Sequence, residues 1–554
     1  MAVDLMPVDH PDQAAYLNNL GNKLEGRYER TGVIADLEEA IRVARQAVDL
    51  TPVDHPDRAG WLNDLGNKLE GRYKRTGEMA DLEEASSHLH AAWSCEAAIP
   101  FHRVQAAARC LSLLNIQCKI DVATQLGQAV LDLLPAVNST LLDRSDQQFV
   151  MSTFASVAAN VCACLLAACR PADALESLEK GRAVIVGQLV DGWNDLSSLR
   201  HEHYDTACQY ERLRDEINET SNDREHGTGR AQAANRRREA MAELNECVEE
   251  IRRFAGHERF LLGQTVAEMQ ECALGGTIVV VNITDFRSDA ILVSKTTIRT
   301  LGLSRLLASD AKAWLGKEWT GREVRRKERP RKNREYLEYL VWLWDVCVKL
   351  VLDVIGADPT SDDLPRIWWI GTGLGSSMPF HAAGVHSRGS TENAFSRAVS
   401  SYTPSIKTLG YAHRRARMTE STQVSLLIAT MPTTPADALS PDAGKLCDLP
   451  GVMKEEKRVT ELVAGSIPIQ SLNSPSVAQV IDKMRDCSIA HFACHGSTDH
   501  ADPSNSGLIL QRQDDQGLKQ DRLTVRRVSE LNLAGARIAY LSACSTRRRD
   551  CLTR

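Results

Sequence analysis

Two neighbouring segments near the N-terminus have nearly the same sequence. Residues 6–40, MPVDHPDQAAYLNNLGNKLEGRYERTGVIADLEEA, recur as residues 51–85, with 27 of 35 positions identical at an offset of 45 residues. In each copy a run of leucines ending in a tyrosine has helical spacing, and a Thr-Gly pair separates it from a second amphipathic stretch. A helix pair that recurs along the chain buries its apolar faces against its neighbours. The repeat therefore predicts an α-helical solenoid.

The helix pair resembles the tetratricopeptide repeat, in a longer-period variety often seen in fungal proteins. This resemblance implies that the repeats bind a protein or peptide partner. The alternative is that they only stack on one another. The near identity of the two copies exceeds what packing requires, because many apolar side chains fill a helix interface equally well. It indicates a recent duplication. Since two repeats rarely suffice for stability, we expect the stack to continue into the helices that follow.

The chain of 554 residues is too long for a single core. We expect tetratricopeptide-like repeats over residues 1–95 and a helical region over residues 96–270. The helical region includes a charged helical hairpin over residues 203–254, with a break near Gly227. From about residue 274 the pattern changes to β-branched runs bounded by turn residues, which are typical of strands. Residues 271–554 are therefore expected to form an α/β domain.

Six apolar runs in this last region are predicted to be strands, and amphipathic helical stretches lie between them. They are GGTIVVVNIT (275–284), DAILVSK (289–295), RIWWIGTG (366–373), VSLLIATMP (424–432), SIAHFACHG (488–496) and ARIAYLSAC (536–544). Continuous apolar strands that alternate with helices favour a largely parallel sheet with both faces covered.

Composition excludes several classes of protein. The net charge of −7 argues against nucleic acid as a partner, because binding phosphate requires a basic face. The N-terminus lacks the pattern of a secretory signal, and no apolar run is long enough to cross a membrane. In such a chain, the 15 scattered cysteines are expected to be reduced thiols, in the cytoplasm or alternatively the nucleus. No nucleotide cofactor is expected, since the glycine run GTGLGSS (371–377) lacks the lysine of a phosphate-binding loop. No metal site is expected either, because Cys162, Cys164 and Cys169 lie in an apolar helical stretch without a histidine nearby.

Two predicted strands end in reactive side chains, His495 and Cys544. In α/β sheets, sites gather at the carboxyl ends of the strands. The two residues are 49 positions apart, which fits the spacing of about 50 between the histidine and the nucleophilic cysteine of caspases. A histidine beside the thiol can activate it and later protonate the leaving amine. Gly496 leaves room for a substrate backbone and offers an N–H to a developing oxyanion. Cys494 is a poor nucleophile candidate, since adjacent strand residues face opposite ways.

Several motifs in this region resemble the CHAT domain, the caspase-like domain that accompanies tetratricopeptide repeats and is related to separase. They are FACHGSTDHADPSNSGLIL (492–510), LTVRRVSELNLAGARIAYLSACST (523–546), WWIGTGLGSSMPFHAAG (368–384) and SSYTPS (400–405). The segment DALESLEKGRAVIVGQLV (173–190) resembles the helix that joins repeats to protease in fungal members. The resemblance implies a cysteine endopeptidase with His495 as the base and Cys544 as the nucleophile, which acts on a protein substrate. His381 and Ser506 lie in family motifs and are expected to be structural or to line a pocket.

The sequence departs from the family after Thr546, where it ends in RRRDCLTR. Members of the family continue for about a hundred residues, which leads us to expect a truncated domain. Two functions follow. In the first, helical repeats recruit protein partners and regulate a cysteine peptidase. In the second, the peptidase domain has lost its activity through truncation, and the chain is a repeat-based interaction scaffold.

Overall fold

The computed structural model describes most of the chain. The described residues are 12–137, 144–189, 195–218, 227–258, 260–317, 319, 327–361, 363–418, 424–435, 446–499, 502–514, 517–529, 531, 533 and 535–543. They divide into two compact units. The first takes in the described residues up to 316, except Leu189, together with 337–407. The second takes in Leu189, the described residues between 317 and 336, and those from 408 onward. None of the helices in these ranges is long and apolar enough to span a bilayer.

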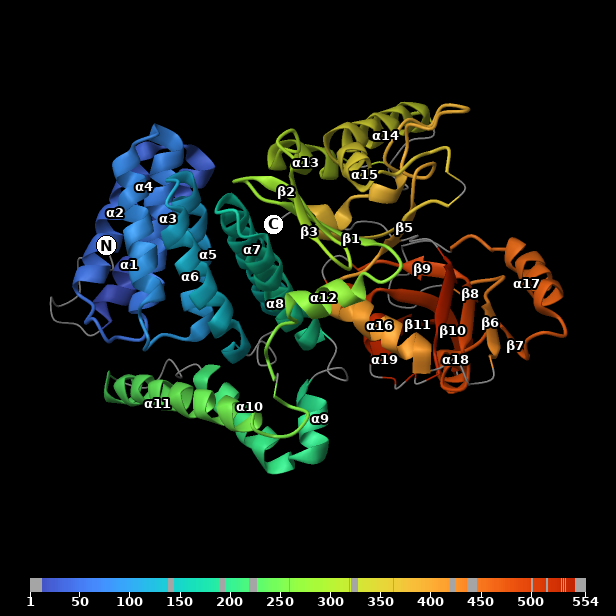
Figure 1. The fold of residues 1–554 in the computed structure, drawn as a ribbon. Helices are drawn as coiled ribbons and strands as arrows, with labels where there is room; N and C mark the ends of the chain where they lie inside the picture. The colour runs from blue at the N-terminus through green and yellow to red at the C-terminus, as the bar shows by residue number, and fades with distance from the viewer. Residues whose placement is uncertain are drawn as a thin grey trace. The chain divides into compact units, whose positions relative to one another are not determined.

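The first unit begins with helices that pack in sequence order as antiparallel pairs (Figure 1). Each copy of the sequence repeat supplies one pair, and a third pair follows without an obvious repeat in the sequence. The bounds are α1 (Gln13–Thr31), α2 (Ile34–Asp49), α3 (Arg58–Thr76), α4 (Met79–Trp93), α5 (Pro100–Ile116) and α6 (Ile120–Leu133). The prediction of a helical solenoid that extends beyond the two copies is confirmed.

Equivalent positions in the two copies make equivalent contacts within each helix pair. The Thr-Gly break works as predicted, since Gly32 and Gly77 end α1 and α3 in the left-handed conformation, which glycine adopts at little cost. Arg27 binds Asp36 through two nitrogen atoms, and Arg72 binds Asp81 in the same way. These charge-assisted pairs tie the first helix of each pair to the second.

Longer helices continue the first unit after α6. They are α7 (Arg144–Ala167), α8 (Pro171–Leu189), α9 (Asp195–Glu202), α10 (Tyr204–Asn218), α11 (Gly227–Ile251) and the short α12 (Val266–Cys272). Helices α10 and α11 pack against each other and share an apolar cluster that includes Leu213 and Leu244. Both helices fall within the residues that were expected to form a charged helical hairpin, and α11 begins at Gly227.

A five-stranded mixed sheet with the order β3-β2-β1-β4-β5 completes the first unit. Its strands are β1 (Thr277–Ile283), β2 (Ser288–Val293), β3 (Ile298–Gly302), β4 (Arg366–Gly373) and β5 (Val399–Tyr402). The helices beside it are α13 (Ala308–Leu315), α14 (Arg329–Leu343) and α15 (Lys349–Ile355). A π-helical turn (Trp344–Val348) joins α14 to α15. Strand β1 runs parallel to β4 and antiparallel to β2. One face of β1 packs against α14 and α15 through Val279 and Val281, and on the other face Asn282 donates a hydrogen bond to the Ala159 carbonyl of α7.

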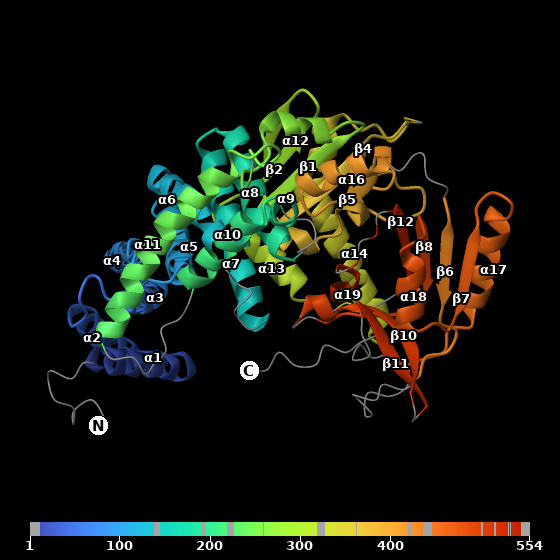
Figure 2. The same ribbon diagram turned by 90° about the horizontal axis from the view of Figure 1, so that it is seen from below.

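The second unit contains a parallel sheet with the order β12-β8-β6-β7 and an antiparallel sheet with the order β11-β10-β9. The bounds are β6 (Leu426–Thr430), β7 (Ile469–Asn473), β8 (Ile489–Ala493), β9 (His495–Ser497), β10 (Gly507–Asp514), β11 (Gly517–Thr524) and β12 (Ile538–Ser542). The helices are α16 (Ile406–Met418), which begins at the end of the first unit, α17 (Gly451–Val463), α18 (Val477–Met484) and α19 (Val525–Ser529). Figure 2 shows β6, β7, β8 and β12 side by side.

The six predicted strands are all present, and the parallel sheet of the second unit justifies the expectation of a largely parallel arrangement. The structure differs from the prediction of a single sheet, because the six strands belong to two sheets. The sheet of the first unit is mixed, since short turns join β1, β2 and β3 in antiparallel pairs. Strands β3, β5, β7, β10 and β11 were not predicted. Their residues are mostly polar or half-buried, so the period-2 signal of a buried strand is weak.

Candidate functional site

His495 lies where two sheets of the second unit meet. Strand β8 ends at Ala493, and after Cys494 the chain enters β9, which begins with His495 itself. Strand β8 runs between β6 and β12 in the parallel sheet, so its carboxyl end lies at the centre of a sheet edge. Strand β9 pairs with β10 instead. This change of sheet places His495 at the edge where the sites of parallel sheets gather, with 4% of its surface exposed.

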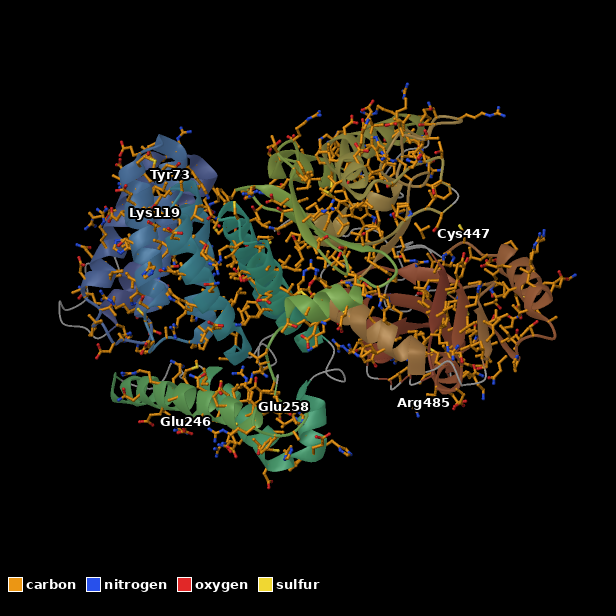
Figure 3. All side chains as sticks on the ribbon, viewed as in Figure 1. Tyr73, Lys119, Glu246, Glu258, Cys447 and Arg485 are labelled. Atoms are coloured by element: carbon orange, nitrogen blue, oxygen red, sulfur yellow. The ribbon has the colours of Figure 1, made fainter. Side chains whose placement is uncertain are left out.

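The ring of His495 is oriented by a backbone carbonyl. Its Nε2 lies 2.7 Å from the carbonyl oxygen of Cys447, in the loop between β6 and α17 (Figure 3 labels Cys447). A carbonyl oxygen can only accept, so Nε2 carries the proton in this hydrogen bond. In the neutral ring Nδ1 then holds the lone pair, which leaves it able to take a proton from a donor on that side. The loop is itself tied to the sheet, because Leu449 donates to the Pro432 carbonyl.

Cys544, the predicted nucleophile, lies outside the described residues. The strand that precedes it is described as far as Ala543. In that strand, β12, Ser542 pairs with Ala493 of β8 in parallel register. His495 is the second residue after Ala493, and Cys544 is the second after Ser542. The pairing of His495 with Cys544 therefore stays a prediction.

Gly496, the predicted oxyanion residue, follows His495 in β9. It is half-buried and pairs with Leu508 of β10. Its role also stays a prediction. Of the two further family residues, Ser506 accepts a hydrogen bond from the backbone N–H of Asp499, which braces the loop between β9 and β10. His381 belongs to the first unit, where its Nδ1 accepts a hydrogen bond from the Tyr402 hydroxyl at 2.8 Å while its backbone N–H donates to the same oxygen.

A second histidine, His491 of β8, takes part in a polar cluster that the sequence analysis missed. It lies four residues before His495, on the face of β8 opposite to Ala490 and Phe492. Its Nε2 is 2.9 Å from a carboxylate oxygen of Glu455 in α17, and its ring stacks on Tyr540 of β12. The other oxygen of Glu455 accepts a hydrogen bond from Ser542. The sequence signal that could have revealed this cluster is the pattern HFACH (491–495), in which two histidines are four residues apart.

The opposite face of β8 is apolar and holds Cys494. Ala490, Phe492 and Cys494 pack in a core cluster with residues of α18, β10 and β11. Burial raises the pKa of the Cys494 thiol to about 12, which removes almost all thiolate at neutral pH. Cys494 is therefore unsuited to nucleophilic attack, in agreement with the argument from strand alternation.

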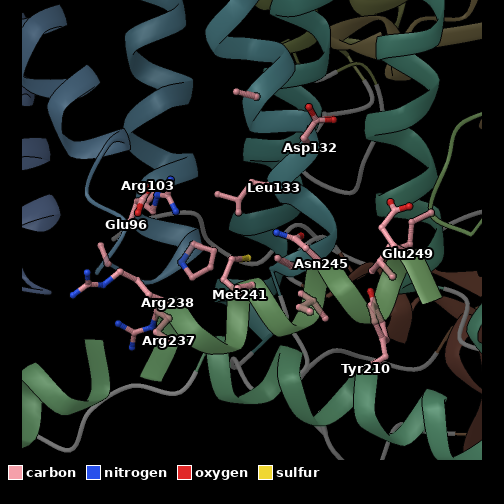
Figure 4. Close-up of a pocket in the computed structure, with 18 of the residues that line it drawn as sticks. Glu96, Arg103, Asp132, Leu133, Tyr210, Arg237, Arg238, Met241, Asn245 and Glu249 are labelled. Atoms are coloured by element: carbon pink, nitrogen blue, oxygen red, sulfur yellow. The ribbon is translucent and has the colours of Figure 1, made fainter. Parts of the chain in front are cut away.

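Other features of the described residues could also bind a ligand, and two of them lie in the helical region. One group of three potential metal ligands comes together there, Glu202, His203 and His257. The other is a cavity of about 710 Å³ between α5, α6 and α11, shown in Figure 4. Its lining combines apolar side chains such as Leu133 and Met241 with charged ones such as Arg238.

Comparison with known proteins finds a family match in the C-terminal part of the chain. Residues 337–553 match the family model of the CHAT domain, and the match spans His495, Gly496 and Cys544. The prediction of a CHAT domain is thus confirmed. No curated protein matches the chain.

Two solved structures resemble the helical part. One is the crystal structure of a putative kinesin light chain from Podosopora anserina with nearly identical TPR-like repeats, which is 18% identical. The alignment covers 44% of this chain and 96% of that one, with a TM-score of 0.23. The other is a variant form of the same putative kinesin light chain, also 18% identical, with coverage of 44% and 100% and a TM-score of 0.24.

Proposed function

We propose that the chain is a cysteine endopeptidase in which His495 is the base and Cys544 the nucleophile, and whose helical repeats bind protein partners. The observation that carries the proposal is the hydrogen bond from Nε2 of His495 to the carbonyl of Cys447. It gives the ring a fixed orientation and leaves the lone pair on Nδ1. A base that is oriented by a third group is the arrangement that activates a nucleophile in acyl-transfer enzymes.

The strand register supports Cys544 as the partner of His495. Neighbouring parallel strands lie about 4.8 Å apart. His495 and Cys544 follow the pair Ala493 and Ser542 at the same count of two residues. The same count on adjacent parallel strands supports a place for both residues just past the carboxyl ends of β8 and β12, at one edge of the sheet. The CHAT match over both residues is consistent with this assignment.

The proposed reaction needs only these groups and water. Nδ1 of His495 accepts the proton of the Cys544 thiol, and the thiolate sulfur bonds to the carbonyl carbon of the scissile peptide. The carbonyl oxygen becomes an oxyanion, for which the N–H of Gly496 is the proposed donor. The imidazolium then gives its proton to the leaving amine as the C–N bond breaks. Water, deprotonated by His495, hydrolyses the thioester and releases the acid.

A peptide probe with a thiol-reactive group tests this function. The full chain should be labelled at Cys544, as located by peptide mapping. Replacement of the base in His495→Ala should slow labelling by about 10²-fold or more, and Cys544→Ala should abolish it. Cys447→Ser is the matched control, because it removes an exposed thiol near His495 and keeps the backbone carbonyl that orients the ring. Equal labelling of the wild type and His495→Ala would refute the proposed dyad.

A role as an interaction scaffold is the second candidate, and the cavity in Figure 4 favours it. The cavity lies against the helices that continue the repeats, and it offers both apolar and charged groups to a ligand. Protein–protein interfaces characteristically combine such groups. A chain with Cys544→Ala that still captures the same partners as the wild type would support binding without catalysis. Loss of partner capture on Met241→Asp, with the fold intact by circular dichroism, would assign the binding to this cavity.

A further inference from the structure

Three side chains with metal-binding atoms converge in the helical region, far along the chain from His495. Glu202 is the last residue of α9, and His203 lies between α9 and α10. His257 belongs to the turn that follows α11. One ligand atom of each residue lies within 4.8 Å of the others. The cluster therefore forms where the start of α10 meets the end of α11.

The geometry between Glu202 and His257 is already close to that of two ligands on one ion. Their atoms Oε2 and Nε2 are 3.2 Å apart. Zinc binds imidazole nitrogen and carboxylate oxygen at about 2.0–2.2 Å, so two such ligands on a tetrahedral ion are roughly 3.3 Å apart. The His257 side chain is 3% exposed and that of Glu202 is 50% exposed. The site is thus anchored on its inner side and open to entry from solvent on its outer side.

The third ligand, His203, is held in place by its surroundings. Its ring stacks on Phe254 with centroids 3.9 Å apart and planes 13° apart. It meets the ring of His257 edge-on at 5.9 Å. Its backbone N–H donates to the Leu199 carbonyl, and its own carbonyl accepts from Ala207. Among the described residues, no side chain hydrogen-bonds to the ring nitrogens of His203, so they remain available to a ligand.

We propose that Glu202, His203 and His257 bind a divalent metal ion of the zinc type. Two imidazoles and one carboxylate form a donor set that suits zinc and its first-row neighbours better than magnesium or calcium, which take mostly oxygen. With three protein ligands, the fourth position belongs to water. The ion joins the α9–α10 corner to the end of α11 and stabilises the charged helical hairpin. The site is independent of the peptidase function.

Metal titration of the chelator-stripped full chain tests the site. Isothermal titration with ZnCl₂ should show saturable binding, and the melting temperature should rise by several degrees, because a ligand that binds only the folded state stabilises it. Cobalt(II) in place of zinc should give visible absorption bands from the bound metal. It should give no thiolate-to-metal charge-transfer band, because none of the three ligands is a cysteine. That feature separates this site from adventitious binding by the 15 cysteines.

Two substitutions and one control locate the ion. Glu202→Gln and His203→Phe should each weaken zinc binding at least tenfold, and phenylalanine at 203 can keep the stacking on Phe254, so the fold is preserved. His201→Ala is the matched control, because His201 is exposed and adjacent in sequence but outside the cluster. Unchanged zinc affinity in both Glu202→Gln and His203→Phe, or no saturable binding by the wild type, would overturn the proposal. In that case the contact between His257 and Glu202 is an ion pair only.

Discussion

Oε2 of Glu179, in α8, accepts a hydrogen bond from the backbone N–H of Ile406, the first residue of α16, at 2.8 Å. Arg182, one turn further along α8, donates to the carbonyl oxygens of Gly371 and Pro404. One carboxylate and one guanidinium of α8 therefore hold the end of β4 and the start of α16. Both side chains lie in the segment 173–190, which resembles the joining helix of fungal members, so this segment contacts these motifs.

Burial of Glu179 predicts that the difference in the free energy of unfolding between the wild type and Glu179→Gln changes with pH. Burial raises the pKa of its carboxyl, and the Arg182 guanidinium opposes the shift only in part. The folded state then keeps a proton that the unfolded chain has released, so this stabilisation is present below the unfolded pKa and lost as pH rises through the folded pKa. Relative to Glu179→Gln, the wild-type free energy of unfolding should fall as pH rises above the ordinary glutamate range. Urea unfolding of both proteins at several pH values measures the difference. A difference that is flat with pH would contradict the prediction.

Two glycines of α3, Gly66 and Gly71, should respond in opposite ways to replacement by alanine. A Cβ at Gly66 would lie 2.7 Å from Cγ of Leu89, whereas a Cβ at Gly71 would have no atom within 4 Å. Gly66→Ala should therefore cost about 1–3 kcal/mol through overpacking. Gly71→Ala should stabilise by about 0.5–1 kcal/mol, because alanine loses less backbone entropy in a helix. Chemical denaturation measures both, and destabilisation of similar size in the two variants would rule out this packing.

A buried lysine joins the two repeats. Lys68 has no exposed side-chain surface, and its Nζ contacts Oε2 of Glu25 at 3.0 Å and Oδ1 of Asn22 at 2.6 Å. Lys68→Ala should cost about 1–3 kcal/mol, because it removes a fully buried side chain together with its contacts to Glu25 and Asn22. Lys23→Ala, at the equivalent position of the first copy, should change stability by less than about 0.5 kcal/mol, since Lys23 is exposed. Thermal or urea unfolding gives both values, and equal costs at the two positions would exclude this role.

The contrast between Lys23 and Lys68 shows what sequence could and could not predict about the fold. Repetition and apolar spacing predicted the helices and their stacking, because both are local or periodic properties. The same residue type at equivalent positions is exposed in one copy and buried in the other, and Lys68 packs against the first copy through its contact with Asn22. Likewise β8 and β12 were evident from their apolar runs. The half-buried β10 and β11 pair with each other as a hairpin and carry little such signal.

The candidate site was predictable in part. His495 was identified from its place after an apolar strand, and the structure puts it at the carboxyl end of a parallel sheet. The group that orients its ring was not predictable, because a backbone carbonyl leaves no trace in residue type. Cys447 contributes to the site through that carbonyl and not through its thiol. Glu455, which binds His491, was missed because the pairing joins a helix to a strand 36 residues away.

Thiol reactivity should divide the cysteines by burial. Burial raises the pKa of Cys110, Cys347 and Cys494 to about 12 in each case, whereas Cys118 and Cys447 are exposed. At roughly pH 8, iodoacetamide should modify the two exposed thiols at least 10²-fold faster than the three buried ones, because only the thiolate reacts and access is also needed. Peptide mapping by mass spectrometry over time measures each rate, and urea should remove the difference. Modification of Cys494 in the native protein as fast as Cys447 would contradict its placement in the core of the second unit.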